Sequence, residues 1–99
     1  MGVVLVRIMR SWDGGEVAPD PDGFVHLSFA EQVPGTVERH HADAAALVFL
    51  VLDESALPSG ALRIEDTAGH GAYPHLYAAL PASAVLRAVP WQAGGPITL

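Results

Sequence analysis

The run from Leu47 to Leu52 most constrains the fold, because it is almost wholly apolar and rich in strand-forming residues. A strand that is apolar on both faces must be covered on both faces, so the run predicts a central strand with packing on each side. The longest apolar stretch, Ala44 to Leu52, is much shorter than the ~18–20 residues of a membrane span. A chain of 99 residues supports one modest core. We therefore expect a single domain over residues 1–99 that does not enter a membrane.

Short strands dominate the rest of the chain, and helices are few. Further strands are expected at Val3–Met9, Phe24–Ser28, Leu62–Glu65, Tyr73–Tyr77 and Val85–Trp91, with Ile97–Leu99 as an additional edge strand. Two short helices, Phe29–Val33 and Thr36–Ala42, are expected on either side of a break at Val33-Pro34-Gly35. Long helices do not alternate with the strands, which disfavours a parallel doubly wound sheet. The predicted class is α+β, with two small, mainly antiparallel sheets packed face to face and two short helices.

Charge and cysteine content exclude several classes of function. The formal net charge is −6, and the chain has five arginines, no lysine and no cysteine. Because the arginines are scattered and form no basic run, binding to nucleic acid is not expected. The lack of cysteine excludes disulfides, thiolate catalysis and cysteine metal sites. Together with an N-terminus that lacks the basic region of a signal peptide, it fits a cytoplasmic protein.

The segment from Phe24 to Glu31 places a histidine and a serine where a strand passes into a helix. Alternation directs Phe24, His26 and Ser28 to one face of the strand. Ser28 and Glu31 have the S-x-x-E spacing of a capping box, and the free N–H groups of a helix start suit an anionic ligand. Two interpretations stay open: His26 and Ser28 contribute to a ligand site, or His26 is a hydrogen-bonded core residue and Ser28 only a cap.

Other polar side chains fall at or near the ends of predicted strands, where a small sandwich forms clefts. The set is His26, Ser28, Glu65, Tyr73, His75 and Tyr77. In one interpretation the glutamate acts as a general base or orients a ribose hydroxyl, and the tyrosines stack on a planar ring. In the other, the set is a buried seam of the core. Arg7, in the first strand, either faces solvent at the strand end or reaches into a pocket.

The histidines do not have the spacing of a metal site. His40 and His41 are adjacent on a predicted helix and point in different directions, and His70 lies in a glycine-rich loop. A zinc site needs three or four converging ligands, and no H-E-x-x-H motif occurs. No metal is therefore expected, and these three histidines are assigned to the solvated surface.

Several motifs, in order and spacing, resemble the family known as domain of unknown function 952. They are Asp22-Gly23-Phe24-Val25-His26-Leu27-Ser28, the following Gln32, the apolar strand that ends at Asp53, Arg63-Ile64-Glu65-Asp66 and Tyr73-Pro74-His75-Leu76-Tyr77. The resemblance extends over about residues 3–91. It implies a fold similar to that of ADP-ribosyltransferases, which is a split pair of antiparallel sheets around an NAD-binding cleft.

The resemblance also implies roles for individual residues. Arg7 matches the first-strand position that holds the dinucleotide, and His26 and Ser28 match the second such motif. Glu65 matches a late glutamate that orients the ribose while nicotinamide departs, and a carboxylate there stabilises the developing positive charge. His75 and Tyr77 belong to the family's own motif. The predicted catalytic residues are thus Glu65, His26 and His75, and the predicted cofactor-binding residues are Arg7, Ser28 and Tyr77.

Three hypotheses for function follow from the sequence. The first is a small enzyme or binding protein whose cleft takes NAD, a related nucleotide or another anionic metabolite. The second is a non-catalytic domain that keeps the fold for stability or to bind a partner protein. The third is an enzyme that uses His26 or Glu65 as an acid or base on a non-nucleotide metabolite. A small-molecule ligand is expected, NAD is the only cofactor implied, and the sequence does not indicate an oligomeric state.

Overall fold

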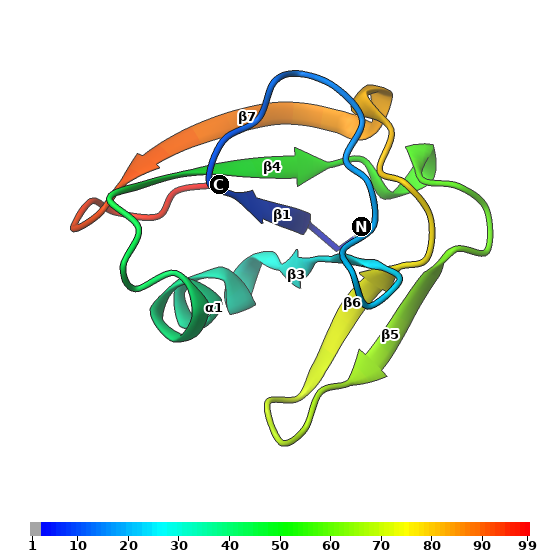
Figure 1. The fold of residues 1–99 in the computed structure, drawn as a ribbon, viewed down its shortest axis with the longest axis horizontal. Coiled ribbons are helices and arrows are strands. Elements are labelled where there is room, and N and C mark those ends of the chain that lie inside the picture. The colour runs from blue at the N-terminus through cyan, green and yellow to red at the C-terminus, as the bar shows by residue number, and fades with distance from the viewer. Residues whose placement is uncertain (1–2) are drawn as a thin grey trace.

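The computed structural model describes residues 3–99, which form two antiparallel sheets, one α-helix and three 3-10 turns (Figure 1). The larger sheet contains β1 (Leu5–Met9), β3 (Ser28–Phe29), β4 (Ala46–Leu52) and β7 (Val85–Gln92). The smaller sheet contains β2 (Val25–His26), β5 (Leu62–Asp66) and β6 (Ala72–Leu76). The helix α1 spans Val33–His40, and the turns η1, η2 and η3 span Ala30–Gln32, Glu54–Ala56 and Ala82–Ala84. The predicted α+β class with two small antiparallel sheets is confirmed.

The apolar run Leu47–Leu52 lies in β4, which is between β1 and β7 in a sheet of order β3-β1-β4-β7. Both neighbouring strands are antiparallel to it. On one face, Leu50 and Leu52 pack in a core cluster shared with the smaller sheet. On the other face, Leu47 and Phe49 pack in a second cluster, to which α1 contributes. The prediction of a central strand covered on both faces is confirmed.

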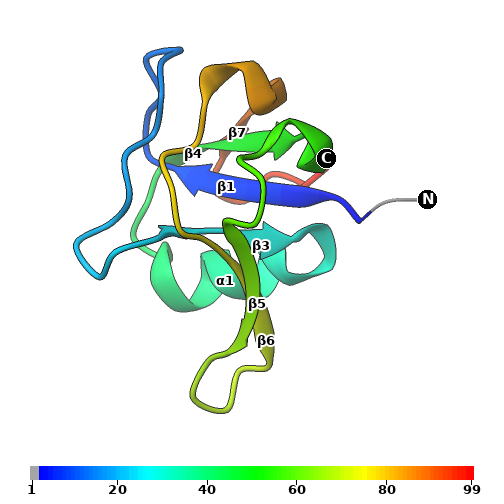
Figure 2. The ribbon, with the colours of Figure 1, turned by 90° about the vertical axis from the view of Figure 1, so that its right-hand side faces the viewer.

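The single strand predicted from Phe24 to Ser28 is wrong, because the chain passes from one sheet to the other within this segment. β2 pairs with β6 in the smaller sheet, whereas β3 pairs with β1 in the larger one. Between them, the buried Leu27 donates its N–H to the carbonyl oxygen of Pro74. Figure 2 shows the β5–β6 hairpin extending away from the larger sheet, past β3. The crossing at Leu27 therefore joins two diverging sheets, and a cleft can form beside it.

The helical region also differs from the prediction, which expected two helices. The predicted break at Val33-Pro34-Gly35 is wrong, since α1 begins there and its proline stands in the first turn. A proline is tolerated at that place because the N–H it lacks would have no acceptor within the helix. The predicted cap is also shifted by one residue: Gln32 Oε1 accepts from the N–H of Phe29 at 2.9 Å, and Ser28 belongs to β3.

Two smaller predictions at the edges of the fold are wrong as well. Alternation along the predicted strand Leu62–Glu65 directs Leu62 and Ile64 inward, but Ile64 of β5 is 52% exposed. Ile97 and Leu99 form no strand and instead pack against the core cluster beside α1. Within residues 3–99, no helix is both long enough and apolar enough to cross a membrane.

Candidate functional site

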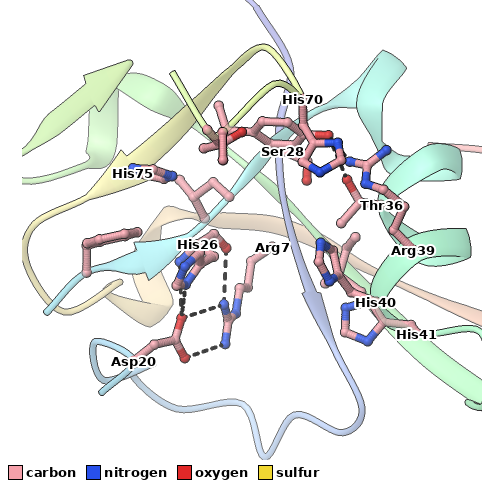
Figure 3. Close-up of a pocket in the computed structure, with 16 residues that line it drawn as sticks. Arg7, Asp20, His26, Ser28, Thr36, Arg39, His40, His41, His70 and His75 are labelled. Atoms are coloured by element: carbon pink, nitrogen blue, oxygen red, sulfur yellow. Dashed lines mark hydrogen bonds and ion pairs between the residues drawn. The ribbon is translucent and has the colours of Figure 1, made fainter. Parts of the chain in front are cut away.

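A cleft of about 600 Å³ lies between α1, the β5–β6 hairpin and the part of the chain around β2 (Figure 3). Its apolar lining includes Ile8 from β1 and Phe24 and Leu27 from the segment that joins the sheets. Its polar lining residues are Arg7, Asp20, His26, Ser28, Thr36, Arg39, His40, His41, Thr67, His70, Tyr73 and His75. The volume falls within the usual range for small-molecule sites.

Positive and titratable side chains are concentrated at this cleft. All five histidines of the chain line it, together with two of the five arginines, Arg7 and Arg39. Asp20 is the only carboxylate among the described lining residues, although the chain has eleven acidic residues and a net charge of −6. The lining thus holds two guanidinium groups and five imidazoles against one carboxylate, and such a lining in a concave, partly apolar site favours an anionic ligand.

Asp20 holds one end of the cleft together. Its carboxylate accepts two hydrogen bonds from the guanidinium of Arg7, at 3.1 and 3.3 Å, and one from the backbone N–H of His26 at 3.2 Å. Burial by itself raises the pKa of Asp20, but the hydrogen bonds from His26 and Arg7 outweigh it and hold the pKa below its usual range. Arg7 therefore reaches inward, as one of the two sequence interpretations has it, and its charge is already offset.

His26 presents both of its ring nitrogens to carboxylates. Nδ1 lies 2.7 Å from Oδ2 of Asp20, and Nε2 lies 3.0 Å from Oδ2 of Asp22. Both contacts are hydrogen bonds at once only when both nitrogens carry a proton. The side chain lines the cleft and is 48% exposed, so it is not the buried core histidine of the alternative interpretation.

The opposite side of the cleft is formed by α1 and the hairpin, as Figure 3 shows for Thr36, Arg39 and the adjacent histidines. Arg39 donates to the hydroxyl of Tyr73, and its guanidinium carbon lies 5.9 Å from the centroid of the Tyr73 ring. The hydroxyl of Thr36 is 3.3 Å from the same tyrosine oxygen. No carboxylate in the described part of the chain pairs with Arg39. Unlike the charge of Arg7, its charge is not offset.

Two histidines extend this side of the cleft at the C-terminal end of α1. Nδ1 of His41 is buried and has no hydrogen-bond partner among residues 3–99. Burial lowers the pKa of His41, and the nearby positive groups Arg10 and His40 lower it further. A buried polar atom without a partner is uncommon in folded proteins.

His75 is fixed by a carboxylate and by an aromatic ring. Its Nδ1 lies 2.8 Å from Oε1 of Glu65, and the hydroxyl of Tyr77 donates to the same oxygen at 2.6 Å. The imidazole stacks on Phe24, with ring centroids 4.1 Å apart. The hydrogen bonds from Tyr77 and His75 lower the pKa of Glu65, and the bond to Glu65 raises the pKa of Tyr77. Glu65 is therefore an ionised acceptor that orients the ring of His75.

The structure brings most of the predicted site residues together. Those that line the cleft are Arg7, His26, Ser28 and His75. The other two, Glu65 and Tyr77, lie outside the lining and reach it only through their hydrogen bonds around His75. The predicted catalytic and cofactor-binding roles of all six stay predictions. In the described part of the chain, no three His, Asp or Glu side chains are grouped so as to hold a metal ion.

Five polar lining residues were not among the predicted site residues, and three of them, His40, His41 and His70, were assigned to the solvated surface. The five are Asp20, Arg39, His40, His41 and His70. Arg39, His40 and His41 lie far in sequence from the β5–β6 hairpin across the cleft, and Asp20 and His70 lie in loops without periodicity, so no local pattern indicated the five residues. The one available sign was compositional: five histidines in 99 residues, in a chain with only five other cationic side chains.

Residues 9–88 match the protein family described as "Protein of unknown function (DUF952)". The chain belongs to the DUF952 family. This DUF952 chain resembles the crystal structure of Protein CC0527 from Caulobacter crescentus, with 30% sequence identity over 88% of this chain and 84% of that chain and a TM-score of 0.76. A double methionine mutant of CC0527 has 29% identity with the same coverage and TM-score. No curated protein matches this DUF952 chain. The comparisons confirm the predicted family and name no activity.

Proposed function

We propose that this DUF952 protein binds a small anionic molecule of the nucleotide class in the cleft, with NAD as the first candidate. The observation that carries the proposal is the gathering of every histidine and of Arg39 around one cavity in a chain of net charge −6. Their concentration at one concave surface produces a local field that attracts anions.

The anionic part of the ligand is expected beside α1. Arg39 is bonded to a neutral hydroxyl, that of Tyr73, and a guanidinium can bind a phosphate through two parallel hydrogen bonds. Thr36 adds a hydroxyl next to it, and His41 also lines this side of the cleft. The opposite end is less suited, because Asp20 already offsets the charge of Arg7.

The planar part of the ligand is expected on the apolar and aromatic lining. Ile8, Leu27 and the ring of Tyr73 all line the cleft, and aromatic rings favour offset stacking on a flat partner. The resemblance to ADP-ribosyltransferases favours NAD among the nucleotides. Glu65 lies outside the lining and is bonded to His75 and Tyr77, so the proposal concerns binding and gives Glu65 no contact with a ribose.

Calorimetric titration at low ionic strength tests this proposal. NAD, ADP-ribose and AMP are expected to bind, and uncharged adenosine to bind at least about tenfold more weakly, because only the anions interact with Arg39. Arg39→Ala is expected to weaken binding of the anions by about 10- to 100-fold, which corresponds to one charged hydrogen-bonding group of ~1.5–3 kcal/mol.

Arg87→Ala is the matched control, because Arg87 is an exposed arginine on β7 that does not line the cleft. It should leave the affinities unchanged. Equal affinity for AMP and adenosine, or equal losses in the two arginine variants, would contradict the proposal. No binding of any of these compounds would favour the hypothesis of a domain kept for stability or for a protein partner.

A further inference from the structure

We propose that His75 is the acid–base residue of the cleft. Its Nε2 exchanges a proton with a hydroxyl group of the bound anionic ligand or with a water molecule beside that ligand. Glu65 and Tyr77 position the ring of His75. This inference rests on the proposed ligand class and goes beyond it, because it makes the protein an enzyme. It also selects one of the two histidines that the sequence alone left as equal catalytic candidates.

The hydrogen bonds around each histidine distinguish them. Both ring nitrogens of His26 face carboxylates, Asp20 at 2.7 Å and Asp22 at 3.0 Å, so neither is free to take a proton from a ligand. His75 has a carboxylate on Nδ1 only, and no hydrogen bond of the described residues engages its Nε2. In its neutral form, with Nδ1 donating to Glu65, the lone pair is on Nε2.

The remaining histidines lack this arrangement. His40 and His70 line the cleft but are exposed, and no described carboxylate lies within hydrogen-bond distance of either ring. His41 has a buried nitrogen without a partner and no carboxylate to orient its ring. Of the histidines in the cleft, His75 alone combines one oriented nitrogen with one free nitrogen.

The surroundings of His75 limit the motion of its ring. Phe24 stacks on one face with an interplanar angle of 25°, and the side chain is only 8% exposed. Glu65 is in turn held by the hydroxyl of Tyr77 at 2.6 Å. A carboxylate that orients an imidazole also stabilises the imidazolium formed when the ring accepts a proton, which is how carboxylates support histidine bases in general.

The proposed step is a proton transfer. The O–H bond of a ligand hydroxyl or of a water molecule breaks, its electron pair stays on oxygen, and an N–H bond forms at Nε2 of His75. The oxygen becomes a stronger nucleophile, and Glu65 stays ionised throughout, in keeping with its lowered pKa. In a later step the imidazolium N–H bond breaks and the same proton passes to the leaving group, which restores the neutral ring of His75.

The first part of the test measures the protonation of the ring directly. Nitrogen NMR is carried out on protein with 15N-labelled histidines, at a pH high enough for the ring of His75 to be neutral. It is expected to show the single ring proton of His75 on Nδ1. Glu65→Gln and Tyr77→Phe should allow a mixture of the two tautomers, whereas Glu54→Gln, at an exposed glutamate of η2, should not. A proton on Nε2 in the unaltered protein would overturn the assignment.

The second part separates binding from chemistry. With NAD and ADP-ribose as probes, His75→Gln should lose turnover by at least about a hundredfold, the usual contribution of a general base, and should lose far less affinity than turnover. Tyr77→Phe is the second variant, because Tyr77 is exposed and its loss of one hydroxyl should not impair folding. It should lower turnover by a smaller factor than His75→Gln and leave the affinity unchanged. Binding of both probes without turnover, or turnover unchanged in His75→Gln, would overturn this inference alone. Absence of binding would instead overturn the proposed function.

Discussion

At the scale of single residues, Asp20 decides which of the cationic groups remain available to a ligand. It accepts from Arg7 twice and from the backbone and ring of His26, so it removes both from the set of free cations. The sequence offers Arg7 and His26 as cleft residues in one of the two interpretations of each, but it does not indicate their partner. Asp20 lies in a loop rich in glycine, proline and acidic residues, where no periodicity marks one carboxylate as different from its neighbours.

Asp20→Asn is predicted to lower the free energy of unfolding at pH 7 by about 1–3 kcal/mol, because the amide leaves partly buried donors of Arg7 and His26 without a charged acceptor. The pKa of Asp20 is lower in the folded protein, so its contribution is complete above the ordinary pKa of an aspartate and is lost as the pH falls through the folded value. The difference between Asp20→Asn and the unaltered protein should therefore shrink between pH 7 and about pH 3.

Urea unfolding at the two pH values measures this difference. Asp66→Asn is the control, since Asp66 is exposed at the end of β5 and forms no ion pair among the described residues. A loss of stability of the same size at both pH values would show that the Asp20 carboxylate does not act through its charge.

At the scale of elements, the sequence predicts strands well and the joins between them poorly. β4 was recognisable because its composition alone requires cover on both faces. The change of sheet at Leu27 could not be recognised from the sequence. β2 and β3 are each two residues long, and the alternation of side chains continues from one to the other as in a single strand. The join is fixed by a long-range hydrogen bond from Leu27 to Pro74, and no local pattern encodes such a bond. The site depends on this join, so its position was harder to predict than its strands.

Two glycines beside the cleft should respond oppositely to the same change. Gly23, just before Phe24, has φ of +101°, and a Cβ there would meet no atom within 4 Å. Gly23→Ala should therefore destabilise the protein by about 1–3 kcal/mol through backbone strain alone. Gly35 lies in α1, where alanine is the better helix former and restricts the unfolded chain, so Gly35→Ala should stabilise by about 0.4–1 kcal/mol.

The one close contact of a Cβ at Gly35 is with Nη1 of Arg39, at 3.2 Å, the end of a flexible side chain that can move aside. Urea unfolding of both variants gives the two changes in stability. A destabilised Gly35→Ala would mean that Arg39 is held more rigidly than its single hydroxyl partner implies, and a neutral Gly23→Ala would show that the turn before Phe24 tolerates other backbone angles.

At the scale of the whole molecule, the distribution of charge separates the cleft from the rest of the surface. Every histidine lies at the cleft, and histidine is the side chain whose charge most readily changes between pH 5 and 8. The composition shows that the chain is acidic and rich in histidine, but only the fold brings α1 and the β5–β6 hairpin together around His26. Their meeting requires contacts between residues far apart in sequence, which is why the gathering of the histidines could not be predicted, although the motifs already suggested an anionic ligand.

The affinity of the cleft for ADP-ribose is predicted to increase as the pH falls from 8 to 6. The charge of a diphosphate diester is constant over this range, so any change reports on the protein. A bound anion stabilises imidazolium forms, and the complex therefore takes up protons. His41 should contribute strongly, because burial together with the charges of Arg10, His40 and Arg7 lowers its pKa, with Asp43 acting in the opposite direction. An anion beside it would offset the positive charges.

Calorimetric titration at several pH values, in buffers of different ionisation enthalpy, measures both the affinity and the number of protons taken up. His41→Gln should reduce the proton uptake and flatten the pH dependence, while Glu54→Gln, at an exposed glutamate of η2 outside the lining, should change the slope little. If ADP-ribose binds equally at pH 6 and pH 8 with no proton uptake, the histidines do not contact the ligand. The concentration of histidines at the cleft would then have to be explained by packing alone.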